Sequence, residues 1–328
     1  MVTLFGVFLL TLLVITAFGI VRAQHLFVSV MLTGIFSLQM AAIFFILDAA
    51  DVALTEAAVG AGIATVLMLG ALALTENRER PTRHRWAPVI VVSATTLMVI
   101  YATFDKPRLG DPDAPVHQHV APWYLEQTPR LIDVPNVVTA ILASFRGYDT
   151  LGELFVIFTA GIGVLFLMAN PSKRGALSLL ASTEAEGLRH HLVPRVVGRL
   201  LVPFIVLFGL YVQFHGDYRP GGGFQAGALI SAGFILHALV DGEGKALEAV
   251  SPRFLRGMIA GGALLYVGVG IAGMLLGGNF LDYSVLAQSS VAGQHLGILL
   301  VEVGVGLTVT GTLLTVFHSF AAREQQER

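Results

Sequence analysis

The sequence contains no cysteine, and it has few charged residues for its length. The absence of cysteine excludes disulfide bonds, thiolate ligation of iron–sulfur clusters and a cysteine nucleophile. Only 13% of the 328 residues are charged, whereas an average soluble domain has about 25%. With 55% hydrophobic residues and a mean hydropathy of +0.76, the composition is typical of a chain that is solvated by lipid.

Long apolar stretches recur along the chain. A helix needs about 20 apolar residues to cross the ~30 Å hydrocarbon core of a bilayer. Stretches of that kind lie at 2–22, 26–47, 52–75, 87–104, 150–169, 196–214, 222–241, 256–277 and 296–318. Lipid cannot hydrogen-bond exposed backbone groups, and the sequence lacks the alternating pattern of barrel strands. We therefore predict an all-α integral membrane protein with about nine transmembrane helices, the first of them retained.

Basic residues are distributed unevenly between the predicted loops. Fifteen of the 20 Lys and Arg residues fall on one side of the membrane, and the other side carries Lys106, Arg108, Arg130, Arg146 and Arg219. Because Lys and Arg favour cytoplasmic loops, we expect the N-terminus outside and the C-terminus inside.

Two polar segments divide the apolar stretches. The outer segment 105–149 is rich in Pro and Asp and ends in VPNVVTAILASF, which we expect to lie along the membrane surface. The second segment, 170–195, is polar and lies on the inner side. This division predicts a four-helix segment 1–104, an outer arm with the fifth helix 105–170, a cytoplasmic linker 171–195 and a four-helix domain 196–328.

Five ionisable side chains fall within or at the edge of the predicted helices. They are Asp51 and Glu56 in the third helix, Glu153 in the fifth, His237 in the seventh and Glu302 in the ninth. A charge at such a depth destabilises the protein by several kcal/mol unless it is paired, hydrated or neutralised. All five are therefore candidates for an ion path or a proton relay.

Each candidate also has a structural explanation that the sequence leaves open. Asp51 would cap the third helix, and Glu56 and Glu153 would interact with the positive ends of their helix dipoles. Glu302 lies deeper and would pair with a neighbouring subunit. His237 would be a hydrogen-bonded interior histidine.

The stretch HGDYRPGGGFQAGAL (215–229) is the clearest loop-to-helix motif, and its core is Pro220, Gly221, Gly222, Gly223 and Phe224. The glycines allow a tight turn and a close backbone approach where the seventh helix begins. Free amides at a helix start would hold an anion. Close packing of membrane helices through small residues is the favoured interpretation.

The sequence gives little indication of catalysis or of metal binding. His117 with His119, and His190 with His191, lack further ligands at metal spacing. No Ser/His/Asp constellation and no nucleotide fingerprint are present, so we predict no cofactor and no enzyme. The net charge of -2 and the lack of like-charge runs give no indication of nucleic acid.

Three segments together resemble the Mrp-type multisubunit cation/proton antiporters and the related membrane arms of membrane-bound hydrogenases. DAADVALTEAAVGAGIATVLML in residues 1–80 resembles part of the C-terminal region of the large, A-type antiporter subunit, which is a separate D-type subunit in the hydrogenases. SFRGYDTLGELFVIFTAGIGVLFL in 87–169 resembles the next, E-like part. RLLVPFIVLFGLYVQFHGDYRPGGGFQAGALISAGFIL in 194–320 resembles the four-helix, B-type (MnhB-like) subunit.

The resemblance implies a subunit of a complex in a prokaryotic plasma membrane that couples proton entry to the export of Na⁺ or another monovalent cation. It implies a functional role for Glu153 in the motif FRGYDTLGE, which also contains Arg146, Gly147 and Asp149. The first five helices also resemble a J-type subunit of respiratory complex I, which implies a π-bulge around Gly60–Gly62.

The implied partners are other antiporter subunits: a large A/D-type subunit, a small C-type subunit and E/F/G-type subunits. They are expected because the long proton-pumping module of a full-length A-type subunit does not precede these segments. One alternative is a membrane-arm subunit of a redox-driven complex, and another is a structural subunit that conducts nothing. A self-sufficient transporter is disfavoured because no inverted repeat is apparent.

The predicted orientation can be tested by cysteine labelling, since the chain has no cysteine of its own. We expect an impermeant thiol reagent to label Ser290→Cys in intact cells and to leave Thr82→Cys unlabelled until the cells are opened. The reverse pattern would contradict the topology and every depth assignment that depends on it.

Overall fold

The computed structural model describes residues 2–79, 86–108, 110–168 and 192–327. These residues contain no β-strand, and nine of their helices are long and apolar enough to cross a membrane, as predicted. The long helices are α1 (Val2–Arg22), α2 (Leu26–Ile46), α5 (Trp86–Thr103), α8 (Gly147–Met168), α9 (Leu192–His215), α10 (Gly223–Asp241), α12 (Pro252–Leu275), α13 (Ser290–Glu327) and the third span described below. Thr82, His190, His191 and most of the linker 171–195 lie outside the described residues.

The third span is a composite of α3 (Ala50–Thr55), the π-helix η1 (Glu56–Ala64) and α4 (Thr65–Ala73). The π-bulge that we expected around Gly60–Gly62 is therefore confirmed. A Cβ on Gly60 would lie 2.6 Å from Glu56 Oε1 and 2.8 Å from Ser37 Oγ, so a side chain there would displace both of these side chains. The wide turn thus brings the Glu56 side chain and helix α2 together over a glycine.

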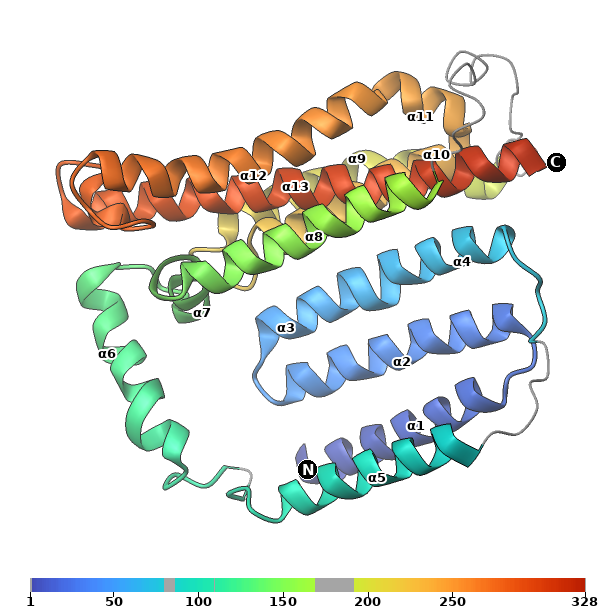
Figure 1. Cartoon of the computed structure of the whole chain (residues 1–328), viewed down its shortest axis with the longest axis horizontal. Helices are drawn as coiled ribbons and strands as arrows, with labels where there is room; N and C mark the ends of the chain where they lie inside the picture. The colour runs from blue at the N-terminus through green and yellow to red at the C-terminus, as the bar shows by residue number, and fades with distance from the viewer. Residues whose placement is uncertain (1, 80–85, 109, 169–191, 328) are drawn as a thin grey trace.

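The C-terminal helices form the most buried part of the molecule. Helix α13 packs against α8, α10 and α12, and α9 packs against α10 (Figure 1). Helices α1 to α4 form a second layer, which joins the first where η1 and α4 contact α10 and α13. The short elements η2 (Val116–Val120) and α6 (Ala121–Leu131) run along one end of the molecule and connect α5 to α7 (Val137–Thr139).

The segment 134–145, which we expected along the membrane surface, packs with one face against protein: Val134, Ala140 and Ala143 are buried, and Val138 and Leu142 are exposed. It forms α7 and the π-helix η3 (Ala140–Phe145). The Asn136 amide donates to the Gly216 carbonyl at 3.0 Å, and the Tyr283 hydroxyl donates to the Ala143 carbonyl at 2.9 Å. The small residues of this segment allow this close packing, which its apolar pattern alone did not reveal.

Glycines set the contact between α12 and α13. A Cβ on Gly262 would overlap the Gly304 carbonyl oxygen and the Thr308 hydroxyl, and it would lie 2.9 Å from the Thr308 amide. A Cβ on the adjacent Gly261 would meet nothing within 4 Å.

We therefore expect Gly262→Ala to destabilise the protein by about 1–3 kcal/mol, because the two helices would have to move apart. Gly261→Ala is the matched control, and it should leave stability unchanged or raise it slightly. Thermal unfolding of the detergent-solubilised protein measures both. Equal stability of the two variants would contradict the close packing of α12 on α13.

Candidate functional site

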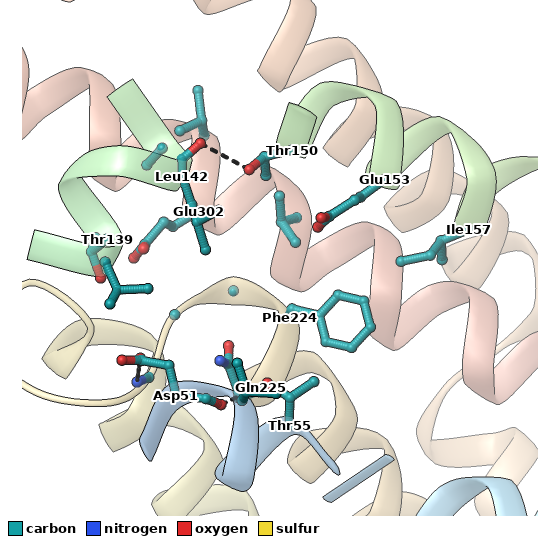
Figure 2. Close-up of a pocket in the computed structure, with 18 of the residues that line it drawn as sticks. Asp51, Thr55, Thr139, Leu142, Thr150, Glu153, Ile157, Phe224, Gln225 and Glu302 are labelled. Atoms are coloured by element: carbon teal, nitrogen blue, oxygen red, sulfur yellow. Dashed lines mark hydrogen bonds between the residues drawn. The ribbon is translucent and has the colours of Figure 1, made fainter. Parts of the chain in front are cut away.

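A cavity of about 570 Å³ lies where α3, α8, α10 and α13 meet. Three of the five candidate residues line it: Asp51, Glu153 and Glu302 (Figure 2). They come from α3, α8 and α13 respectively, so segments far apart in the sequence converge there. None of the residues that line the cavity is Lys, Arg or His.

Asp51 connects the N-terminal layer to the glycine turn. One of its carboxylate oxygens accepts the backbone N–H of Gly221 at 3.2 Å, across 170 residues of sequence. The residue that caps α3 is Ala49, without a side-chain hydrogen bond. The capping interpretation of Asp51 is therefore wrong, because its carboxylate accepts its hydrogen bond from the turn between α9 and α10.

Glu153 and Glu302 face the cavity from two sides, with Phe224 in the same view (Figure 2). A Cβ on Gly222 would lie 3.1 Å from Glu302 Oε1, so this carboxylate rests on the turn before α10. Neither glutamate forms an ion pair or a hydrogen bond with another described residue. Their remaining neighbours include Val156 and Val305, which do not solvate a charge.

The residues Gly221, Gly222, Gly223 and Phe224 of the predicted glycine motif line the cavity, and Pro220 precedes them. Gly222 has a φ of 123°, in the region that favours glycine. A Cβ on Gly223 would overlap the carbonyl oxygen of Glu302. The turn thus serves close packing, as favoured above, and the carboxylates beside it make it unsuitable for an anion.

The motif FRGYDTLGE positions the start of α8. Arg146 and Asp149 form an ion pair at 2.5 Å, and the Gly147 carbonyl accepts the Tyr266 hydroxyl at 2.8 Å. The sequence analysis did not identify Tyr266 and Tyr283. Their hydroxyls donate to the carbonyls of Gly147 and Ala143, on either side of the turn between η3 and α8. Burial raises the pKa of the Tyr283 hydroxyl well above its ordinary value, so it remains a neutral donor.

The cavity also has neutral polar lining residues that the sequence did not single out: Thr55, Thr139, Thr150 and Gln225. Thr139 donates to the Gly216 carbonyl at 2.8 Å, and Thr150 donates to the Leu142 carbonyl at 2.9 Å. Threonine and glutamine are common in membrane helices, so the sequence alone does not mark these residues as part of a site. Only their position in the fold identifies them as cavity residues.

The other two candidates lie elsewhere. Glu56 lies beside Gly60, near Ser37 of α2, and is not among the residues that line the cavity. His237 Nδ1 lies 3.4 Å from an Asp241 oxygen, and Asp241 also accepts hydrogen bonds from Arg199. The interpretation of His237 as a bonded interior histidine fits this cluster, which joins α9 to α10.

Family models match most of the chain in three pieces. Residues 193–315 match a domain related to the MnhB subunit of a Na⁺/H⁺ antiporter. Residues 11–77 and 88–176 match the families described as the D and E subunits of MBH. The three carboxylates of the cavity therefore come from three different family segments, one from each.

The chain is 36% identical over 132 residues to a putative antiporter subunit mnhB2 of Staphylococcus aureus (strain Newman), covering 39% of this chain and 93% of that protein. The chain belongs to the Mrp-type antiporter subunits. It is also 25% identical over 327 residues to a probable K⁺/H⁺ antiporter A/B subunit of Rhizobium meliloti (strain 1021), covering 90% of this chain and 32% of that one.

A solved chain from the Mrp complex of Dietzia sp. DQ12-45-1b has a similar structure, with a TM-score of 0.75 and 27% sequence identity. The similarity covers 95% of this chain and 34% of the Dietzia chain. This Mrp-type subunit thus spans about a third of the length of the Rhizobium meliloti protein and of the Dietzia chain. Its apolar helices and its family place it in a prokaryotic plasma membrane as a multi-pass protein.

The hydrogen bond between Asp51 and Gly221 predicts a difference between two variants. Asp51→Ala removes the acceptor and should expose the Gly221 amide, because a hydrogen bond to a charged group contributes about 1.5–3 kcal/mol. Asp51→Asn keeps an oxygen acceptor and should retain most of the protection. Hydrogen–deuterium exchange of the turn 216–222 measures the effect, with the exposed Asp105→Ala as control. Unchanged exchange in Asp51→Ala would contradict the contact.

Proposed function

We propose that this chain is a subunit of a multisubunit monovalent cation/proton antiporter and that its cavity lies on the ion path. The observation that supports this most strongly is the convergence of Asp51, Glu153 and Glu302 on one cavity that no Lys, Arg or His lines. A structural carboxylate in a membrane is normally paired with a cation. Three carboxylates without such a partner are suited to binding a mobile one.

The physical chemistry of the cavity supports exchange of a proton for a cation. Its apolar lining, such as Val156, Ile157 and Phe224, cannot solvate a permanent charge. Glu153 and Glu302 are therefore neutralised either by a proton or by a monovalent cation. Because one charge replaces the other at the same carboxylate, the two ions compete, and this competition is the basis of antiport.

The proposed activity belongs to a complex. The proposed partners are a large A/D-type antiporter subunit, a small C-type subunit and E/F/G-type subunits, as the resemblance implies. Both Na⁺ and K⁺ occur in the names of the matching family and relatives. We propose Na⁺ as the transported cation, and K⁺ is the alternative that the same transport measurement distinguishes.

A second function is favoured by the matches of residues 11–77 and 88–176 to the D and E subunits of MBH. In that alternative, the same carboxylates would translocate ions in a redox-driven complex. The subunit composition of the purified complex separates the two functions. Hydrophilic iron–sulfur subunits would support the redox-driven complex, and antiporter subunits alone would support the antiporter.

The central prediction concerns Glu153 and Glu302. Glu153→Gln and Glu302→Gln keep the size of the side chain but remove its titration, so we expect each to lower cation/proton exchange by about 100-fold or more. Glu153→Asp keeps the charge and should retain partial activity. Exchange is measured with a pH-sensitive dye in vesicles that contain the purified complex, after addition of Na⁺ or K⁺.

The control for these variants is Glu126→Gln on α6, where the side chain is exposed. This variant should exchange ions at the normal rate. Size-exclusion chromatography establishes that each variant complex assembles. If both cavity variants assemble and exchange ions normally, the chain is a structural subunit that conducts nothing.

A further inference from the structure

Two titratable side chains lie between Glu302 and the end of the membrane at which α13 begins. His295 is seven residues before Glu302 on α13, about 10 Å along the helix and on the same face. Asp217 belongs to the short connection between α9 and α10, which ends beside the same part of α13. Neither residue lines the cavity.

Asp217 lies close to Glu302 in space. A Cβ on Gly216, the neighbour of Asp217, would lie 3.2 Å from Glu302 Oε2. Asp217 and Glu302 are thus close enough for their charges to interact. His295 in turn interacts electrostatically with Asp217. Asp217 thus interacts with both His295 and Glu302.

Both residues have a buried atom without a partner. Asp217 Oδ1 and His295 Nε2 are enclosed, and neither forms a hydrogen bond with another described residue. Buried polar atoms of this kind destabilise a protein, and an unpaired one calls for an explanation. Burial also raises the pKa of the Asp217 carboxyl, and this effect outweighs the opposing charge of His295. The raised pKa makes protonation of Asp217 easier.

We infer that His295 and Asp217 form a proton relay that connects Glu302 to the side of the membrane on which α13 begins. This inference rests on the proposed function, because it assigns the route by which Glu302 gains and loses its proton. His295 takes a proton from water at Nδ1, the ring nitrogen that is not enclosed, and becomes an imidazolium that also carries a proton on Nε2. It then passes one proton to the Asp217 carboxylate, which passes one to Glu302, so that each step neutralises the acceptor and restores the donor.

The surrounding charges are compatible with this direction of transfer. The ionisable groups that face the relay and Glu302 are Asp51 from α3, Glu153 from α8 and Tyr266 from α12. Two of them are carboxylates, which favour a proton arriving at Glu302. Tyr266 donates its hydroxyl to the Gly147 carbonyl and does not compete for that proton.

The test uses the assembled complex in vesicles. We expect Asp217→Asn and His295→Ala each to lower cation/proton exchange by about tenfold or more. Asp217→His restores a titratable group and should recover much of the rate. Imidazole added to His295→Ala should also accelerate exchange, which a histidine needed only for packing would not allow.

The controls are Asp105→Asn and His119→Gln, both on exposed side chains, and these should exchange ions normally. If Asp217→Asn and His295→Ala assemble and exchange at the normal rate while Glu302→Gln does not, the relay is overturned and the proposed function stands. If imidazole and Asp217→His fail to restore exchange, both residues act structurally and the relay is likewise overturned. Normal exchange in Glu302→Gln would instead contradict the role of Glu302 itself.

Discussion

The structure depends on how closely the turn of three glycines approaches α13 and α3. Gly223 packs on the carbonyl of Glu302 without room for a Cβ, and Gly222 adopts a positive φ beside the Glu302 carboxylate. Gly221 donates its amide to Asp51. A side chain at Gly223 would push α10 away from α13, and one at Gly221 would overlap the Val212 carbonyl of α9 and disturb the turn that holds Asp51 of α3. The cavity is bordered by the backbone of Gly221, Gly222 and Gly223, where no side chain fills the space.

The carboxylates of this protein show two different ways of keeping a charge in a membrane. Asp241 is buried and accepts hydrogen bonds from Arg199, with His237 nearby, so its charge is balanced permanently by the protein. Glu153 and Glu302 have no such partner among the described residues. A permanent ion pair stabilises a helix contact but leaves nothing to exchange. The missing partner is therefore the feature that suits the cavity carboxylates to a mobile ion.

The sequence predicted the helices well because length and hydropathy determine them, and it predicted Glu302 because no helix end explains a charge at its depth. It could not predict the neighbours of each side chain. Glu56 lies five residues after Asp51, which is about 140° further around an α-helix, so it lies beside α2 and does not line the cavity. Asp217 looked like an ordinary loop residue, since its closeness to Glu302 arises only from the way the connection between α9 and α10 packs beside α13.

None of the three family segments contains the whole of the proposed ion site. Residues 11–77 contribute Asp51, residues 88–176 contribute Glu153, and residues 193–315 contribute Glu302 together with the glycine turn. A single carboxylate on an isolated segment would face lipid or a different partner. The cavity is thus a property of the contact between segments, and their arrangement sets the distances between its charges. Any movement of α3 or α8 relative to α13 changes those distances, and through such a movement a neighbouring subunit would have the physical means to control the proposed ion path.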